Sequence, residues 1–518
     1  MTPTPATPQP LPPVTVAADR WLAEHEADLR LLAAGAADLA AFKPRLAARG
    51  LYEQRTEGAW MLRVKLPGGV LPTQEARLLA ELARTYAGGG LHLTTRQAIQ
   101  LHGVKLADTP ALLRRLDAAG LTSRGGGGNA VRGVTACPYA GVCPHEAFDV
   151  TPFAAAISAY LLAQPGSFTL PRKLKYAFSG CRRDCAFAAA TDLGYVAVVK
   201  DGQPGFELWG GGGMGARPRP ADPLCDFIPA ADAIRAAEAI RRIFDRHGDR
   251  ANRARARLRF AVEAMGAAAF QATFASELAA CRADPSIPAA DCPATPQAAP
   301  PPAPDTPPRL SPDPASGLRV AREKAAATVS VKLFIPLGLL PADDLTLLAE
   351  LADRFSTECG LRATQDQNLL LRRVRLADLP ALASELRKLA TDGTTTRALD
   401  AITVCTGAGI CRLGSCQSRT AALAVAEALE TAGADLGGRI LRISGCPNAC
   451  GQHHLGEIGL SGCRVSGAGA SVSGYQIWTG ARLGAGPGFR FASELRKVSE
   501  GELPAALVAL VTGGGEES

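Results

Sequence analysis

Two stretches of the chain share one pattern of hydrophobic and polar positions. Residues 64–101 and residues 331–371 each begin with alternating apolar residues, continue with an amphipathic segment around LLAELA, and end in a second apolar run. Alternation is typical of a half-buried strand, and apolar residues at helical spacing after a proline predict a helix. Because partial identity accompanies the shared pattern, the sequence predicts an internal repeat of a strand–helix–strand unit.

The repeat continues downstream through paired cysteines. CPYAGVC at 137–143 matches CTGAGIC at 405–411, and SGCRRDC at 179–185 matches SGCPNAC at 444–450. The second pair follows a β-like run in both copies. We therefore expect an α+β unit that is internally duplicated, with two halves related by a pseudo-twofold axis and a cofactor at their junction.

Composition places the chain among globular proteins. Its 518 residues are 47% hydrophobic and 20% charged, which is ordinary for such proteins. No apolar run is long enough to span a bilayer, and the Pro/Thr-rich start lacks the basic and apolar regions of a secretory signal. We therefore expect a cytoplasmic protein without a membrane partner, whose thiols stay reduced and whose cysteine clusters serve metal binding or catalysis.

The positive charge of the chain is mild and local. The net charge is +7, and basic residues concentrate in 241–260. This run fits a solvated helical face, a cradle for an anionic cofactor, or a surface for an acidic protein partner. It lacks the recognition motif and the interleaved aromatic residues of nucleic-acid binding, so we expect no nucleic-acid partner.

The second group of four cysteines is a candidate metal centre. Four thiolates suit either a structural zinc ion or a [4Fe–4S] cluster. Zinc ribbons use tighter pairs, whereas one pair here is separated by five residues, which favours the bulkier cluster. The proposed ligands are Cys405, Cys411, Cys446 and Cys450.

The order of motifs along the chain carries a family resemblance. The C-x5-C pair and the later G-C-P-N-x-C motif resemble those of the sulfite and nitrite reductase family, whose members pair a [4Fe–4S] cluster with siroheme. Further family-like blocks stand in order at 62–69, 93–103, 131–138, 170–181, 211–215 and 245–260. The resemblance covers most of the chain apart from the N-terminal tail and a Pro/Ala-rich linker.

The resemblance implies a domain organisation. Two ferredoxin-like half-domains related by a pseudo-twofold axis would combine with two α+β domains that bind siroheme and the cluster. The expected divisions are a flexible tail (1–20), the first half-domain (21–125), the first siroheme/substrate-binding repeat (126–282), the linker (283–317), the second half-domain (318–397) and the cluster/siroheme-binding repeat (398–518).

The resemblance also implies roles for individual residues. Cys450 would be shared between the cluster and the siroheme iron, and a cationic pocket over that iron would bind the oxyanion through Arg63, Arg132, Lys173 and Lys175. Lys173 and Lys175 are two apart on an expected strand and so project to one side. Polar and glycine residues would hold the many siroheme carboxylates: Thr94, Arg96, Gln100, His102, Gly211, Gly212, Arg253, Arg257 and Asn448. Arg96, Gln100 and His102 share one strand parity, and Arg253 and Arg257 are about one helical turn apart.

Two departures from the family pattern accompany this assignment. His92 stands where better-known sulfite reductases have arginine, which would remove or replace one carboxylate contact. Gly133 stands where the family usually has asparagine.

The first group of four cysteines has two interpretations. Cys137, Cys143, Cys181 and Cys185 are either a relic of the duplication or the ligands of a second cluster. The family has one active cofactor assembly per chain, and Lys173 and Lys175 already commit this region to the substrate pocket. A second cluster is therefore not the favoured expectation.

The resemblance implies a six-electron reduction of sulfite to sulfide or of nitrite to ammonia. Lys175 favours sulfite slightly, because nitrite reductases tend to carry asparagine there and a doubly charged anion gains from one more cation. Two alternatives remain: a monooxygenase of cobalamin biosynthesis similar to precorrin-3B synthase, and a non-catalytic four-cysteine metal-binding protein. No flavin or dinucleotide motif is visible, so electrons would come from a ferredoxin or a flavoprotein.

Overall fold

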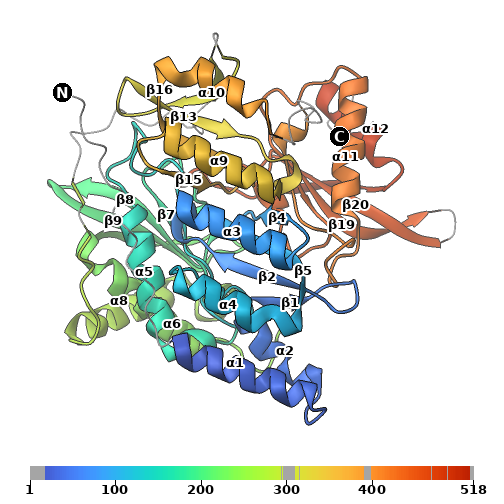
Figure 1. The fold of residues 1–518 in the computed structure, drawn as a ribbon. Helices are drawn as coiled ribbons and strands as arrows, with labels where there is room; N and C mark the ends of the chain where they lie inside the picture. The colour runs from blue at the N-terminus through green and yellow to red at the C-terminus, as the bar shows by residue number, and fades with distance from the viewer. Residues whose placement is uncertain are drawn as a thin grey trace.

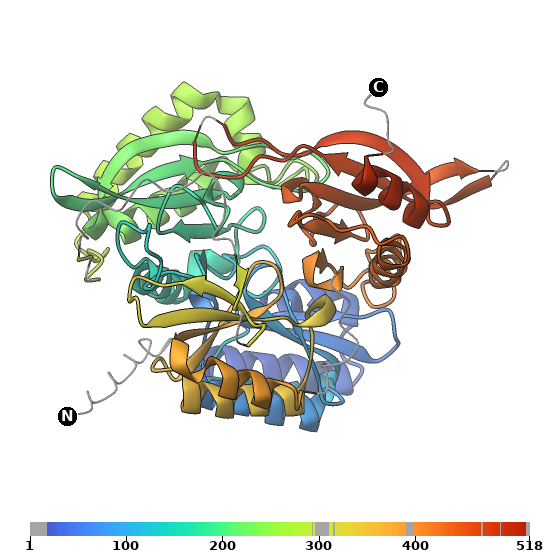
Figure 2. The ribbon, with the colours of Figure 1, turned by 90° about the horizontal axis from the view of Figure 1, so that it is seen from above.

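The computed structural model describes residues 18–292, 294–295, 310–313, 316–389, 398–467, 470–486 and 488–513. Seen from above, two half-domains lie against each other, and two larger lobes lie to either side of the junction (Figure 2). None of the described helices combines the length and the apolar character that crossing a bilayer requires. Most of the expected tail lies outside the described residues.

Each half-domain contains an antiparallel sheet that borrows one strand from the other half. The first sheet has the order β1 (Leu51–Glu53), β2 (Ala59–Lys65), β5 (Ala98–Lys105), β4 (Gly90–Leu93) and β14 (Leu339–Pro341). The second has the order β11 (Ser311–Pro312), β12 (Arg319–Arg322), β13 (Thr328–Leu333), β16 (Leu369–Arg375), β15 (Gly360–Ala363) and β3 (Val70–Pro72). Because β3 and β14 cross over, the two half-domains form one body.

Matching helices cover the two sheets and seal a common core (Figure 1). α3 (Thr73–Tyr86) and α9 (Ala342–Phe355) both begin directly after a proline, carry acidic residues in the first turn and end near an arginine, as the helix dipole favours. Their apolar faces belong to one buried cluster that draws on both halves. The remaining helices of this body are α1 (Ala18–Ala33), α2 (Leu39–Ala48), α4 (Thr109–Ala118) and α10 (Leu379–Leu386).

The two lobes repeat a second topology. The first lobe has the strand order β10 (Asp222–Pro229), β9 (Gln203–Gly210), β8 (Leu193–Lys200), β7 (Tyr176–Ser179) and β6 (Thr135–Ala136). The second has the order β17 (Ile402–Val404), β18 (Leu441–Ser444), β19 (Ile458–Gly467), β20 (Ala470–Thr479) and β21 (Ser493–Ser499). In both lobes the first three strands in chain order are parallel and the last two antiparallel. The predicted duplicated α+β fold is therefore confirmed.

Helices pack on both lobe sheets. The first lobe carries α5 (Thr151–Ala163), α6 (Ala233–His247), α7 (Leu258–Met265) and α8 (Ala267–Ala283), and the second carries α11 (Ser418–Thr431) and α12 (Leu503–Thr512). The expected linker at 283–317 is partly outside the described residues. Its described ends join their neighbours, since Ile287 and Ala290 are buried in the first-lobe core and β11 pairs with β12.

Candidate functional site

The second cysteine group lies at one edge of the second-lobe sheet. Cys405 follows β17 and Cys446 follows β18, and these parallel neighbours end at the same edge. The Cys405 sulfur accepts a hydrogen bond from the Gly445 amide at 3.1 Å. Burial, followed by the nearby Cys450, raises the pKa of Cys405, and burial raises the pKa of Cys446 to about 11. The thiols of Cys450, Cys405 and Cys411 are close enough to contribute to the raised pKa of Cys446. The four predicted ligands therefore lie together.

The loop that carries Cys450 is fixed against the first half-domain. The Thr95 hydroxyl donates to the Cys450 carbonyl at 2.7 Å, and the Gln452 amide donates to the Thr95 carbonyl at 3.0 Å. Arg442 in turn donates to the Gln452 side chain at 2.8 Å. Cys450 is nevertheless exposed. The loop is held from behind, and its last thiol is left open to a ligand.

A cationic wall from the first lobe faces Cys450. Lys173 and Lys175 flank Leu174, which bridges Val131, and the Arg132 amide donates to the Leu174 carbonyl at 2.8 Å. The lysines thus lie just before β7, and Arg132 lies beside them. The Cys450 charge acts on both Arg132 and Lys173.

Burial and neighbouring cations lower the pKa values of this wall. Burial, then Arg257, lowers the pKa of Lys173 to about 7. Burial has the largest effect on Lys175, and the positive charges of Arg96 and Lys173 add to it. Together they hold the pKa of Lys175 well below its ordinary value. Like charges crowded in a poorly solvated region disfavour further protonation. The wall therefore favours an anionic ligand.

Asp192 is a buried carboxylate beneath the wall that sequence reasoning missed. It follows a short turn before β8, and its two oxygens each accept from the Arg257 Nη2 atom at 2.9 Å. The Lys175 backbone amide donates to the same carboxylate at 3.0 Å. Asp192 therefore orients Arg257 and the lysine segment together. It carries no motif that local sequence could reveal.

Gln100 connects the predicted residues of the first half-domain. With its amide oxygen toward Arg63, it accepts from Arg63 Nη2 at 2.6 Å, and its nitrogen then donates to His92 Nδ1 at 2.8 Å and lies 3.3 Å from His102 Nε2. Gln54 contacts the other nitrogen of His102 at 2.9 Å. Burial, followed by Arg419 and Arg63, lowers the pKa of His102 to about 3. The predicted set Arg63, Gln100 and His102 is brought together, with His102 neutral.

His92 does not replace the charge of a family arginine. Burial, then Arg419, holds the pKa of His92 well below its ordinary value. Its Nε2 atom lies 3.0 Å from the Gln367 amide nitrogen, which belongs to the second half-domain. His92 is thus a neutral bridge between the halves.

Two predictions about local structure are wrong. Arg253 and Arg257 do not share a helix, because α6 ends before Gly248 and the Asp249 carboxylate caps a turn; Arg253 is exposed, whereas Arg257 precedes α7 and is buried. Arg96 is not on the strand of Gln100, because Gln97 adopts a φ of 53° and β5 begins after it. Arg96 still reaches the wall, where its Nη2 atom donates to the Gly133 carbonyl at 2.6 Å.

The remaining predicted residues make hydrogen bonds that involve backbone groups. The Thr94 hydroxyl accepts from the Arg96 and Ala98 amides at 3.3 and 3.1 Å. The Asn448 backbone N–H, and not its side chain, donates to the Cys446 sulfur. Gly211 and Gly212 donate to the carbonyls of Asp192 and Thr191, at 2.9 and 3.1 Å, and so continue the strand edge beside the wall.

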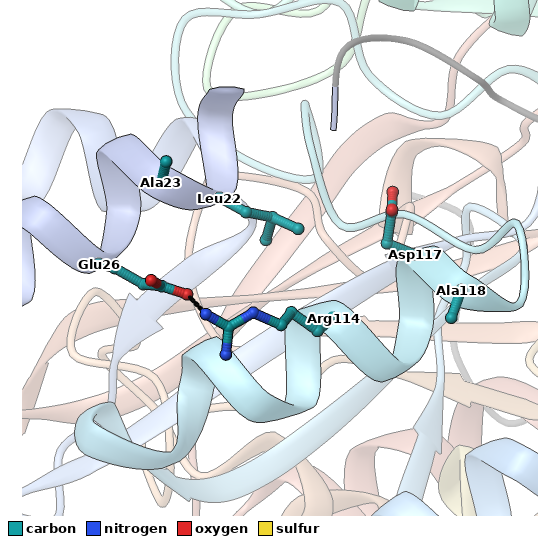
Figure 3. A pocket seen from close by; sticks show the side chains of 6 residues that line it. All are labelled: Leu22, Ala23, Glu26, Arg114, Asp117 and Ala118. Carbon is teal, nitrogen blue, oxygen red and sulfur yellow. Dashed lines mark hydrogen bonds and ion pairs between the residues drawn. The ribbon is translucent and has the colours of Figure 1, made fainter. Parts of the chain in front are cut away.

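A pocket elsewhere on the surface is unrelated to this site. It lies between α1 and α4, where Glu26 and Arg114 form an ion pair (Figure 3). Its six lining residues include none of the predicted site residues.

Known proteins resemble the chain over most of its length. A model described as the nitrite and sulphite reductase 4Fe-4S domain matches residues 127–280, and one described as the nitrite/sulfite reductase ferredoxin-like half domain matches 52–119 and 322–389. A ferredoxin–nitrite reductase of Synechococcus elongatus is 34% identical, covering 83% of this chain and 81% of that protein. The chloroplastic ferredoxin–nitrite reductase of Zea mays is 32% identical, covering 85% and 76% respectively. The solved structure of Mycobacterium tuberculosis NirA has a TM-score of 0.77 and 27% identity, covering 92% of this chain and 87% of that one.

The chain belongs to the nitrite and sulfite reductase family. It is therefore an oxidoreductase, and the predicted pair of ferredoxin-like half-domains is confirmed. The two alternative functions are not favoured by these matches. The expected preference for sulfite has no support from these ferredoxin–nitrite reductases, which are named for nitrite.

Several unpaired arginine nitrogens lie near the predicted site residues. Buried nitrogens of six arginines find no hydrogen-bond partner among the described residues. Four of these arginines belong to the site or act on its residues, namely Arg132 (Nη1), Arg257 (Nε), Arg259 (Nε) and Arg419 (Nε and Nη2); the other two are Arg235 and Arg442. Leaving cationic donors buried and unpaired is costly. Arg259 and Arg419 were missed from sequence, although Arg259 stands in the predicted basic run. The donors fit a ligand with several carboxylates.

The four cysteines of the second lobe suit an iron–sulfur cluster, because four thiolates gathered at one site are the usual ligands of a [4Fe–4S] group. The matched family model described as a 4Fe-4S domain covers residues 127–280 of the first lobe and does not include these cysteines.

Proposed function

We propose that this protein reduces nitrite to ammonia, using electrons from a ferredoxin, one [4Fe–4S] cluster and siroheme. The observation that carries the proposal is the cationic wall of Arg132 and Lys173 directed at Cys450, the exposed last cysteine of the second group. Three relatives, among them those of Synechococcus elongatus and Zea mays, are named as ferredoxin-dependent nitrite reductases, and these names support the same substrate and donor. The net charge of +7 suits an acidic donor.

The cofactor roles follow from the donor types. Cys405, Cys411, Cys446 and Cys450 would hold the cluster. Five arginines would bind the siroheme carboxylates: Arg96, Arg132, Arg257, Arg259 and Arg419. When bound, the cofactors would supply stored electrons and an iron centre for the anion. The protein contributes the anchoring charges and the proton donors around that position.

Arg132 and Lys173 have complementary roles in the proposed reaction. Arginine holds its charge and offers forked donors that match the two oxygens of nitrite. Lys173, with a pKa of about 7, is protonated in part near neutrality and can release its proton. Conversion of nitrite to ammonium consumes eight protons and six electrons and releases two waters, so a donor of this kind is required.

The surroundings of Lys175 disfavour the additional positive charge on which the expectation of sulfite depended. Burial and three neighbouring cations, Arg96, Lys173 and Arg257, hold its pKa well below the ordinary value. Its segment is also tied down, through the backbone amide bond to Asp192. Lys175 therefore gives weaker support for a doubly charged anion.

Tyr52 extends the proposed substrate pocket. Its hydroxyl accepts from the Gly128 amide at 2.7 Å, and although burial opposes ionisation, Arg132 and Arg63 lower its pKa. Arg63 lies over its ring at 5.8 Å. Tyr52 would thus position both arginines against the anion, and no motif announces it.

Steady-state kinetics test the proposal. The full-length protein, purified without oxygen, is assayed with one reduced ferredoxin as donor, and kcat/KM is compared for nitrite and sulfite. We expect siroheme absorbance, ammonia as product and a higher kcat/KM for nitrite. Replacing Lys173 with Gln should lower kcat/KM for nitrite by about 10²–10⁴-fold, whereas Lys200→Gln, at the exposed end of β8, should not change it. A higher kcat/KM for sulfite, or equal effects of the two variants, would contradict the proposal.

A further inference from the structure

The first cysteine group is assembled in space as the second is. Cys137 and Cys143 lie in the loop after β6, and Cys181 and Cys185 lie in the loop after β7, its parallel neighbour. The Cys137 thiol interacts with Cys185, and the Cys143 thiol with Cys181. Cys137 and Cys143 are coupled as well. All four thiols are therefore neighbours, and all are free of disulfide bonds.

The backbone holds the two cysteine groups by matching hydrogen bonds. In each lobe the first cysteine donates its amide to the second strand, and the second cysteine donates to a carbonyl four residues earlier. The bonds are Cys137 to Phe178 at 2.8 Å and Cys405 to Ile443 at 3.0 Å, and Cys143 to Tyr139 and Cys411 to Gly407, both at 2.9 Å.

The turns that carry the fourth cysteine of each group share the same unusual positive φ values. Asp184 and Ala449, which each precede the fourth cysteine, have φ values of 54° and 55°. Phe187 and Gln452, two residues after it, have values of 59° and 62°. Non-glycine residues adopt this region rarely and at a cost. The two loops therefore follow the same path, although the residues that adopt it differ.

The first-lobe loop is also clamped by the opposite half-domain. Arg372 donates to the carbonyls of Pro138 and Ala140, at 3.2 and 2.5 Å, and the Lys324 amide donates to Val142 at 2.9 Å. In the second lobe the Arg55 amide donates to the equivalent carbonyl, that of Ile410, at 2.9 Å.

The charged residues around the first cysteine group differ from the cationic wall near Cys450. The counterparts of Arg63 and Arg96 in the repeat are Lys332 and Asp366, which pair with each other. Arg362 and Arg372 both pair with Glu358, and the charge of Asp149 acts on both arginines. Four cations at this mirrored position thus have carboxylates nearby, since Arg442 acts on Asp366, although the Arg442 Nε atom has no hydrogen-bond partner among the described residues.

We propose that Cys137, Cys143, Cys181 and Cys185 bind a second [4Fe–4S] cluster that has no siroheme beside it. If the thiols were only small fillers, other small apolar residues would serve, and four cysteines on a doubly strained, clamped loop would not be needed. Three of the four are buried, Cys137, Cys143 and Cys181, at 3%, 5% and 7% exposure. The cluster would be shielded from solvent and separate from the nitrite site.

Counting iron and acid-labile sulfide in the full-length wild-type protein tests this proposal. Protein purified without oxygen and loaded with siroheme should contain about nine irons and about eight sulfides per chain, against about five and about four for a single cluster. A count of about five, one zinc per chain without additional sulfide, or two disulfides in the denatured, unreduced protein would each overturn it.

A pair of variants assigns the additional iron to this group. Cys143→Ala/Cys181→Ala should lose about four irons and about four sulfides while the siroheme absorbance per chain stays unchanged. The control Cys225→Ala/Cys281→Ala removes two cysteines outside both groups and should lose none. If the first variant does not fold, the wild-type count still decides. If the wild type lacks siroheme, the proposed function fails, but the difference of about four irons between the variants still reports the first-lobe cluster.

Discussion

Asp192 offers a sharp test of how the cationic wall is held in place. Its carboxylate is fully buried and receives two bonds from Arg257, each 2.9 Å, and one from the Lys175 amide at 3.0 Å. Asp192→Asn keeps the size and one acceptor but removes the charge. Arg257, only 8% exposed at its side chain, then remains as a buried cation without a counterion. Breaking a buried pair from one side costs about 3–5 kcal/mol, and we expect the lower end because the amide oxygen still accepts one bond.

Asp222→Asn is the matched control. Asp222 forms an ion pair of the same atom types with Arg219 in the same lobe, at 2.5 Å, but the two side chains are 31% and 20% exposed. Such a pair contributes about 0–1 kcal/mol. The two substitutions therefore make the same chemical change in a fully buried and in a partly exposed setting.

Urea unfolding of the full chain measures the difference. The free energy of unfolding of the transition that includes the first lobe, obtained from its denaturation midpoint with a common slope, should fall by about 3 kcal/mol for Asp192→Asn and by at most about 1 kcal/mol for Asp222→Asn. Because Arg257 loses its orientation, the purified Asp192→Asn protein should also retain less siroheme per chain. Equal losses of stability and of siroheme in the two variants would refute the role given to Asp192.

Two further predictions concern stability. Burial, together with the positive charge of Arg49, lowers the pKa of His25 to about 4, below the value of about 6.5 in the unfolded chain. Folding therefore favours the neutral imidazole. The stability that this preference contributes is complete above pH 6.5 and is lost as the pH falls toward 4. The loss amounts to about 3 kcal/mol, and His25→Gln, but not the exposed His247→Gln, should flatten the pH dependence of the unfolding free energy in that window. A Cβ atom at Gly459 would lie 2.0 Å from a backbone carbonyl, whereas at Gly501 nothing lies within 4 Å. Gly459→Ala should therefore cost about 1–3 kcal/mol or more and Gly501→Ala less than about 0.5 kcal/mol, as thermal unfolding would show; similar melting temperatures would contradict the clash.

Local pattern was sufficient for the repeats but not for their assembly. The strand–helix–strand units and the cysteine pairs of both lobes could be predicted from the spacing of residues, because strand and helix periodicities are local properties. The exchange of β3 and β14 between the sheets joins residues far apart in the chain, and no local signal encodes it. The error at Arg253 was avoidable, since Gly248 and Asp249 are residues that commonly end a helix and form a turn.

The site residues divide in the same way. Arg132 and Lys173 stand within family-like blocks and were predicted, whereas Asp192, Arg419 and Tyr52 act through contacts with distant segments. A buried carboxylate under several arginines becomes visible only when the charges are placed in space. Such partners are the usual omissions of a motif-based assignment.

Duplication also explains why a single nitrite site would suffice. Each half-domain fixes the cysteine loop of a lobe, through Thr95 to the Cys450 loop and through Arg372 to the Cys137 loop, so both loops keep their shape. The cations, by contrast, have diverged: Arg96 remains in the wall, while its counterpart Asp366 neutralises Lys332. Holding thiols requires only the shared backbone path, whereas binding a polycarboxylate and an oxyanion requires surplus positive charge. Symmetry in the loops and asymmetry in the charges are therefore independent, and the chain can retain two cysteine sites while keeping one cationic wall.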